Sequence, residues 1–265
     1  MLGDLVQEGR VPGLAIQVCF RGETWFVAGF GKADIETGTA VLPETTVFRI
    51  ASISKPITAT ALALLVAEGV LQLDEDVRAY VPEFPKEHGL ITLRQLASHT
   101  AGIRGYRGKE FALNRPVGIA ESLELFADDP LLFPPGEGYH YNSFDFVLLS
   151  LAMQRAAGLP FHQVVAERVL KPLSMTSTQM ETPGRPVPGQ ASFYSRFGKD
   201  FRRAVPVDTR YKLATLLISR NRKAEAAEVL EDYVDLNYAK HVRKARKMLV
   251  ACLFDEKMYT ETIPA

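Results

Sequence analysis

Cysteine is scarce in this chain of 265 residues, which has only Cys19 and Cys252. The two lie far apart in the sequence, and each sits inside an apolar run such as Leu249-Val250-Ala251-Cys252-Leu253. Apolar surroundings are typical of buried, reduced thiols. We therefore expect both side chains to be buried and expect no structural disulfide.

Net charge is absent as well, because 31 Lys and Arg residues balance 31 Asp and Glu residues. Nothing in this balance calls for nucleic acid or an anionic membrane as a partner. No window approaches the roughly 18 apolar residues of a membrane span, and the N-terminus carries no basic patch followed by a long apolar stretch. The sequence predicts a soluble globular protein, cytoplasmic as written and mitochondrial or periplasmic if an upstream targeting segment was lost.

Residues that form turns disappear towards the C-terminal end of the sequence. There is no glycine after Gly198 and no proline between Pro206 and Pro264. Apolar residues in 209–254 instead recur at the spacing of amphipathic helices. We place a boundary near Thr215, where the composition changes.

The first part of the sequence predicts a β-hairpin followed by helices. Leu14–Phe20 and Thr24–Ala28 are predicted to be strands, joined by a turn at Arg21-Gly22-Glu23. The glycines of 29–34 resemble a dinucleotide-binding loop, but no helix follows them, so we interpret them as a turn at the end of a strand. Apolar periodicity and stop signals then predict helices at 54–68, 92–98, 144–157 and 161–171.

Ser52 and Lys55 form an S-x-x-K pattern at the start of the first of these helices. Side chains three positions apart share a helix face, so the hydroxyl and the ammonium can meet. A serine needs a base to attack a carbonyl, and a lysine whose charge is disfavoured can serve. The pattern is short, and a surface serine beside an ordinary lysine is the alternative.

A second candidate group surrounds Tyr141, which follows a Pro-Gly turn and precedes a helix. A phenolate stabilised by a nearby ammonium could accept the serine proton or pass it to the leaving group. The alternative is that Tyr139 and Tyr141 are aromatic packing anchors. The five histidines show no H-E-x-x-H or clustered spacing, so we expect no metal site and no cofactor.

Four segments in order resemble the serine β-lactamase-like family, which is related to class C β-lactamases, D-alanyl-D-alanine carboxypeptidases and lactamase-fold esterases. The similarity is greatest to its mitochondrial type and the bacterial relatives of that type. It runs from about residue 10 to Ala214 and is carried by Phe48–Lys55, Tyr80–Pro85, Leu96–Arg104 and Pro135–Tyr141.

The resemblance implies a serine hydrolase that acts on peptide, lactam or ester carbonyls through an acyl-enzyme. In this chemistry Ser52 attacks, Lys55 and Tyr141 move the proton, and water releases the acyl group. This sequence differs from the family's Y-x-N motif, because Ser143 occupies the third position and the asparagine is at the second, Asn142. We assign Ser143 and Asn142 to substrate binding, and the departure puts the substrate preference in doubt.

The family's K-T-G or H-x-G segment, which lines the cleft and supplies an oxyanion N–H, is absent from this sequence. The resemblance therefore predicts a truncated α/β fold of the β-lactamase and penicillin-binding-protein type, with a mixed antiparallel sheet and a helical domain. We expect an incomplete hydrolase domain at 1–214 and an all-helical segment at 215–265, which is a genuine module or a fusion, splice or frameshift product. Without its partner strands, Leu14–Phe20 would be an open, apolar sheet edge.

Two functions follow from these observations. The first is a serine hydrolase with impaired activity whose partner is a small-molecule or peptide substrate. The second is a catalytically inactive relic or binding module whose C-terminal helices dock another protein. Sequence does not assign the natural substrate or the oligomeric state.

Overall fold

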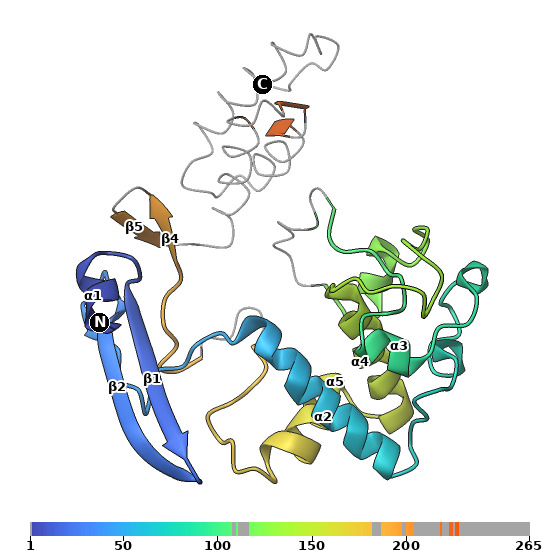
Figure 1. Ribbon diagram of the computed structural model, residues 1–265, viewed down its shortest axis with the longest axis horizontal. Coiled ribbons are helices and arrows are strands. Elements are labelled where there is room, and N and C mark those ends of the chain that lie inside the picture. The colour runs from blue at the N-terminus through green and yellow to red at the C-terminus, as the bar shows by residue number, and fades with distance from the viewer. Residues whose placement is uncertain are drawn as a thin grey trace. The chain divides into compact units, whose positions relative to one another are not determined.

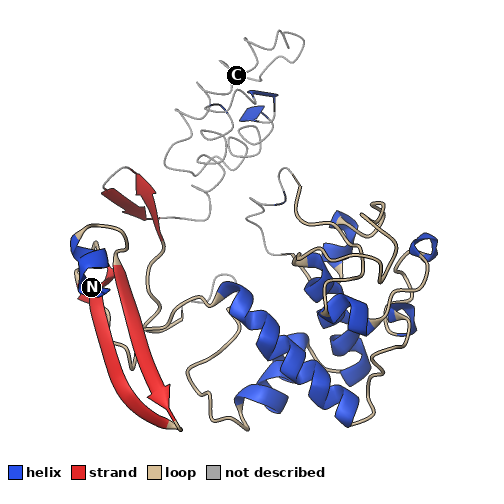
Figure 2. Ribbon diagram, viewed as in Figure 1, coloured by secondary structure: helices blue, strands red, loops and turns tan. Residues whose placement is uncertain are grey.

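The computed structural model describes residues 2–107, 110, 117–181, 187–197 and 200–203, together with single positions between 218 and 227. These residues form two compact units. One contains the described residues up to Phe48 and from 187 onward, and the other contains those from Arg49 to 181. Figure 2 shows that the strands belong to the first unit and that nearly all described helices belong to the second. The predicted boundary at Thr215, the segment after it and Cys252 lie outside the described residues.

The strand-rich unit is built around one long antiparallel hairpin (Figure 1). Helix α1 (Leu2–Gln7) precedes β1 (Gly13–Phe20) and β2 (Glu23–Asp34), which pair from Gly13–Gly31 to Phe20–Glu23, and β3 (Thr39–Ala40) adds to β2. Strands β4 (Tyr194–Phe197) and β5 (Asp200–Arg203) form a separate pair. The predicted hairpin is therefore confirmed, with its turn at Arg21 and Gly22.

The glycines of 29–34 lie inside β2, so the expected turn at the end of the strand is wrong. A Cβ at Gly29 would lie 2.4 Å from the carbonyl oxygen of Val41. Gly31 has a φ of 71° and would place a Cβ 2.3 Å from the carbonyl oxygen of Pro12. Glycine is needed at these positions because backbone from other segments comes too close for a side chain.

Strand β1 has an unpaired edge among the described strands, and the hairpin exposes apolar side chains. Among the described strands β1 pairs only with β2, and its side chains are mostly exposed. Large apolar side chains of the hairpin are accessible to solvent, namely Val18, Phe20, Trp25, Phe26 and Val27. Within the described part of the chain the edge of β1 is unpaired, as expected. The expectation that Cys19 is buried is wrong, because this residue is exposed.

The second unit is helical and contains the main core. Its helices are α2 (Ser54–Ala67), α3 (Leu93–Ala97), α4 (Phe144–Ala157) and α5 (Phe161–Val165), and α5 continues into a π-helical turn over Ala166–Leu170. Short 3₁₀ turns cover Ala51–Ile53, Val77–Ala79, Lys86–His88 and Glu121–Leu125. Among the described residues no helix has the length and hydrophobicity to cross a bilayer.

Local signals explain where these helices begin and end. Thr92 caps α3 in a reciprocal capping box with Gln95, and Gly158 ends α4 in the left-handed conformation. Helix α2 packs on α4 and α5, and α3 also packs on α4. Their shared core is fully buried and includes Leu65, Leu96, Leu148, Leu149 and Met153. This core holds α2 and α4 together in one compact unit.

Two glycines of this unit provide a matched test of close packing. Gly102 has a φ of 82°, and a Cβ there would lie 2.3 Å from the carbonyl oxygen of Phe133, whereas Gly69 has a φ of 73° with open space around it. We expect Gly69→Ala to cost about 1 kcal/mol of unfolding free energy, from the backbone conformation alone. Gly102→Ala should cost about 3 kcal/mol, because the clash adds to the same strain. Urea denaturation of both variants measures the difference, and equal losses would contradict the close approach at Gly102.

Candidate active site

Ser52 lies in the short 3₁₀ turn Ala51–Ile53, immediately before α2, rather than within the α-helix. Its predecessor Ala51 has a φ of 45°, in the left-handed region that residues other than glycine seldom occupy. This turn changes the direction of the chain abruptly and leaves Ser52 exposed to solvent. A hydroxyl at such a position is accessible to a substrate.

Lys55 occupies the first turn of α2, and its Nζ donates a hydrogen bond to Ser52 Oγ at 3.2 Å. The ammonium also faces two aromatic rings, at 4.7 Å from the ring centre of Tyr141 and 5.7 Å from that of Phe146. The pairing expected from S-x-x-K spacing is therefore present. Ring faces of this kind attract a cation, so they hold the lysine side chain in place.

Tyr141 comes from the loop before α4 and reaches the same two side chains. Hydrogen bonds with Lys55 and then with Ser52 lower the pKa of its phenol below the ordinary value of 10.0. Tyr139 and Tyr141 are 67% and 50% exposed. These fractions do not fit the alternative in which both tyrosines are buried packing anchors. A hydroxyl, an amine and a phenol thus meet at one accessible point.

The two residues that follow Tyr141 differ in their surroundings. Asn142 is buried, and its amide donates to the carbonyl oxygens of Ile103 and His140 and to Asp145, while its Oδ1 accepts the backbone N–H of Asp145. The amide group of Asn142 is therefore hydrogen-bonded to other groups of the protein. Ser143 is the N-cap of α4, but its hydroxyl makes no capping hydrogen bond, and the residue is partly exposed. The geometry thus offers Ser143, rather than Asn142, to a substrate.

His99 and Asp145 form a buried pair beneath Tyr141 that the sequence does not predict. His99 Nδ1 lies 2.9 Å from Asp145 Oδ2, and their side chains are only 9% and 1% exposed. Burial raises the pKa of Asp145 to about 8, against a smaller opposing effect of the hydrogen bond from Asn142. Burial also lowers the pKa of His99, as do the positive charges of Lys55 and His140. No local pattern reveals this pair, because its members are 46 positions apart.

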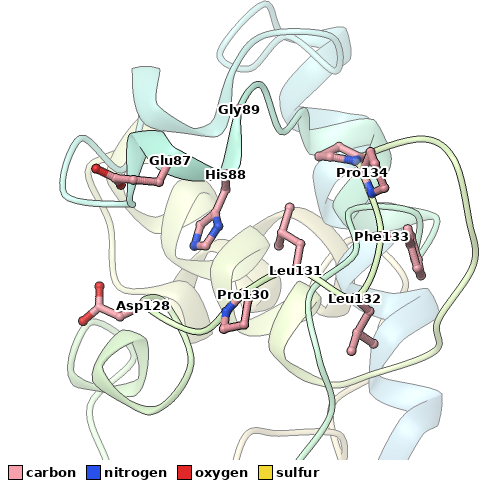
Figure 3. A pocket seen from close by; sticks show the side chains of 10 residues that line it. Glu87, His88, Gly89, Asp128, Pro130, Leu131, Leu132, Phe133 and Pro134 are labelled. Atoms are coloured by element: carbon pink, nitrogen blue, oxygen red, sulfur yellow. The ribbon is translucent and has the colours of Figure 1, made fainter.

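A pocket of the helical unit is lined by other residues, namely Glu87, His88, Gly89, Asp128 and 130–135. Figure 3 shows the carboxylates of Glu87 and Asp128 towards one end and Phe133 and Pro134 towards the other. The His88 ring is engaged with the carbonyl oxygen of Ala127 at 2.6 Å. Since Ser52, Lys55 and Tyr141 are not among the lining residues, we do not assign the reaction to this pocket.

Comparison with known proteins identifies the family. The Beta-lactamase family model matches residues 1–227. The human mitochondrial serine beta-lactamase-like protein LACTB is 28% identical over 285 aligned residues, which cover 81% of this chain and 52% of that protein. Esterase EstB of Burkholderia gladioli is 35% identical over 189 residues, covering 64% of this chain and 47% of the esterase. The chain spans about half the length of these relatives.

A solved structure shows the same fold. EstCE1, described as a hydrolase with promiscuous acyltransferase activity, aligns with a TM-score of 0.67 and 26% identity, over 76% of this chain and 56% of its own. The sheet-plus-helix fold is therefore of the β-lactamase and penicillin-binding-protein type. Together with the family match over most of its length, this likeness shows that the chain belongs to the β-lactamase family, which includes serine hydrolases.

Proposed function

We propose that this protein is a serine hydrolase that cleaves ester, lactam or peptide carbonyls through an acyl-enzyme on Ser52. The observation that carries the proposal is the meeting of Ser52, Lys55 and Tyr141. Lys55 Nζ donates a 3.2 Å hydrogen bond to Ser52 Oγ and lies 4.7 Å from the ring centre of Tyr141, and both side chains lower the pKa of the Tyr141 phenol. A nucleophile needs a base within hydrogen-bonding reach, and this arrangement offers two.

In the proposed reaction, Ser52 Oγ forms a bond to the substrate carbonyl carbon while its proton passes to Tyr141 or Lys55. The lowered pKa of Tyr141 supports this step, because it makes the phenolate more available near neutral pH. The same proton is then delivered to the leaving alcohol or amine as the carbonyl reforms. A water molecule completes the cycle by hydrolysing the acyl-Ser52 ester with help from the same groups.

The oxyanion that forms on the substrate needs hydrogen-bond donors. Backbone N–H groups at the start of α2 can donate to the developing negative charge. The sequence holds no K-T-G or H-x-G segment, which in the family supplies a further donor. Loss of one donor costs roughly 3 to 4 kcal/mol of transition-state stabilisation. We therefore propose slow acylation by this chain.

Covalent labelling tests the proposed nucleophile. A fluorophosphonate probe should label the wild type and Ser54→Ala, a matched control two residues away, and the labelled peptide in a mass spectrum should contain Ser52. Ser52→Ala should lose at least about 100-fold in labelling rate, because it removes the serine hydroxyl that lies 3.2 Å from Lys55 Nζ. Equal labelling of Ser52→Ala and wild type would refute the assignment.

A binding protein without catalysis is the second candidate function, favoured by the missing K-T-G or H-x-G segment. It predicts no labelling of the wild type by the fluorophosphonate or by a fluorescent β-lactam. It also predicts no turnover of p-nitrophenyl esters beyond that of Ser52→Ala. Labelling at Ser52 in the wild type would exclude this candidate.

A further inference from the structure

The loop that carries Tyr141 is fixed on both sides of the tyrosine by the segment that follows α3. The backbone N–H of His140 donates to the carbonyl oxygen of His99 at 2.9 Å. On the other side, Asn142 donates to the carbonyl oxygen of Ile103 at 3.1 Å. The backbone of Tyr141 is thus held between two cross-links, and the orientation of its ring depends on what lies beneath it.

The His99 imidazole lies beneath that ring. Its centre is 4.6 Å from the ring centre of Tyr141 and 5.3 Å from that of Phe146, the two rings that also face Lys55. His99 has a φ of 61° because it follows the C-cap of α3: its N–H bonds to the carbonyl oxygen of Leu96 at 3.3 Å, and the N–H of Thr100 bonds to that of Gln95 at 2.9 Å, as in the Schellman ending of a helix. This ending leaves His99 Nδ1 2.9 Å from Asp145 Oδ2.

Asp145 fixes the imidazole from the opposite side. Its Oδ2 accepts a 2.7 Å hydrogen bond from Asn142 and contacts His99 Nδ1, whereas its Oδ1 is buried without a hydrogen-bond partner. An ionised carboxylate with a bare oxygen is costly in such a place. The protonated carboxyl suits the site better, in accord with the raised pKa of Asp145.

The charges around the pair come from two directions. Lys55 faces it from α2, and His140, Tyr139 and Tyr141 face it from the loop before α4. The neutral forms of both groups are favoured, since burial and the charges of Lys55 and His140 lower the pKa of His99, and burial raises that of Asp145 to about 8. If Asp145 ionised, its negative charge would stabilise the Lys55 ammonium and oppose a phenolate on Tyr141.

We propose that His99 and Asp145 are positioning residues for Tyr141, and that acylation of Ser52 requires the protonated form of Asp145. This inference rests on the proposed function of Ser52, Lys55 and Tyr141. The imidazole holds the phenol ring against Lys55, and the neutral carboxyl holds the imidazole without placing a negative charge behind the two proton carriers. Loss of one proton from Asp145 therefore slows the reaction.

The pH dependence of acylation tests this proposal. In the wild type the rate of Ser52 labelling should fall by about tenfold between pH 7 and pH 9, with a midpoint near the pKa of Asp145, about 8. Asp145→Asn mimics the protonated carboxyl, so its rate at pH 7 should stay within about threefold of wild type and its decline should move to higher pH. Asp128→Asn, a matched change at an exposed carboxylate, should keep the wild-type profile. An unchanged profile in Asp145→Asn would overturn the proposal.

Stability provides a second readout with a defined sign. Asp145 has a pKa of about 8 in the folded protein against 3.8 ordinarily, so the folded state binds the extra proton between those values. Its contribution to stability is complete below about pH 4 and is lost as the pH rises towards 8. Relative to wild type, Asp145→Asn should therefore gain stability steadily between about pH 4 and 8 in urea denaturation. A constant difference across that range would contradict a protonated Asp145.

The role of the imidazole ring is tested by His99→Asn. Asparagine tolerates the left-handed backbone and keeps a donor for Asp145, but it removes the ring beneath Tyr141. Turnover of a p-nitrophenyl ester should show kcat lowered by about 30-fold with KM changed less than about threefold, because a misplaced proton carrier affects the chemical step. A wild-type kcat in a folded His99→Asn protein would refute positioning.

A measurement on the unaltered protein covers the case in which the variants do not fold. The ¹⁵N resonances of the His99 ring should shift as Asp145 titrates, with a midpoint near pH 8. Resonances that stay constant from about pH 6.5 to 9.5 would overturn the inference. The two proposals can be refuted separately. If Ser52 is not labelled at any pH, the proposed hydrolase function is refuted. If the wild type is labelled and the Asp145 and His99 variants behave like it, only the positioning role of the pair is refuted.

Discussion

Lys55→Arg is expected to slow acylation of Ser52 by about 10³-fold, although it keeps the positive charge at the start of α2. Arginine does not lose its proton in proteins, so it cannot accept one from a serine hydroxyl. It can still donate a hydrogen bond in place of the one that Lys55 makes to Ser52 at 3.2 Å. The substitution thereby separates the role of a base from that of a fixed charge. The rate of fluorophosphonate labelling at Ser52 measures the effect.

Lys171→Arg provides the control, because Lys171 is an exposed lysine of the same helical unit. It should label at the wild-type rate. If Lys55→Arg also labelled within a few-fold of wild type, Lys55 would act as a charge only, and Tyr141 would be left as the sole base. That outcome would leave Ser52 as the nucleophile but would contradict the sharing of one proton between Lys55 and Tyr141.

Features set by local sequence could be predicted without the structure. Helix α4 was expected at 144–157 and occupies Phe144–Ala157, because Gly158-Leu159-Pro160 stops it within one turn. Ser52 and Lys55 are three residues apart, so their contact depends on one turn of backbone. The Thr92 cap is equally local. In each case the deciding interaction spans only a few residues.

Features set by contacts between distant segments could not be predicted in this way. The prediction for Gly29 is wrong because the group that excludes a side chain there is the backbone of Val41, in another segment of the chain. Cys19 lies in an apolar run that would ordinarily be buried, yet no described strand covers that side of β1. The pairing of His99 with Asp145 could not be predicted for the same reason, since only folding brings the end of α3 to the start of α4.

The contact between Tyr141 and Ser52 also joins segments that are distant in the sequence. It could be predicted only because the family's motifs occur in order. Neither the spacing of Tyr141 from Ser52 nor the composition of its loop places the phenol beside Lys55. The structure supplies that contact, and with it a reason to test the hydroxyl separately from the ring.

Tyr141→Phe is expected to lower the acylation rate of Ser52 by about 10²-fold. Phenylalanine keeps the ring that packs 4.6 Å from His99 and 4.7 Å from Lys55 Nζ, so the surroundings of the site should persist. What disappears is the hydroxyl whose hydrogen bonds with Lys55 and Ser52 lower its pKa. Tyr139→Phe, at a more exposed tyrosine of the same loop, should label normally. Since the ring is retained, a large loss confined to Tyr141→Phe would assign the effect to proton transfer rather than packing, and a wild-type rate would remove Tyr141 from the mechanism.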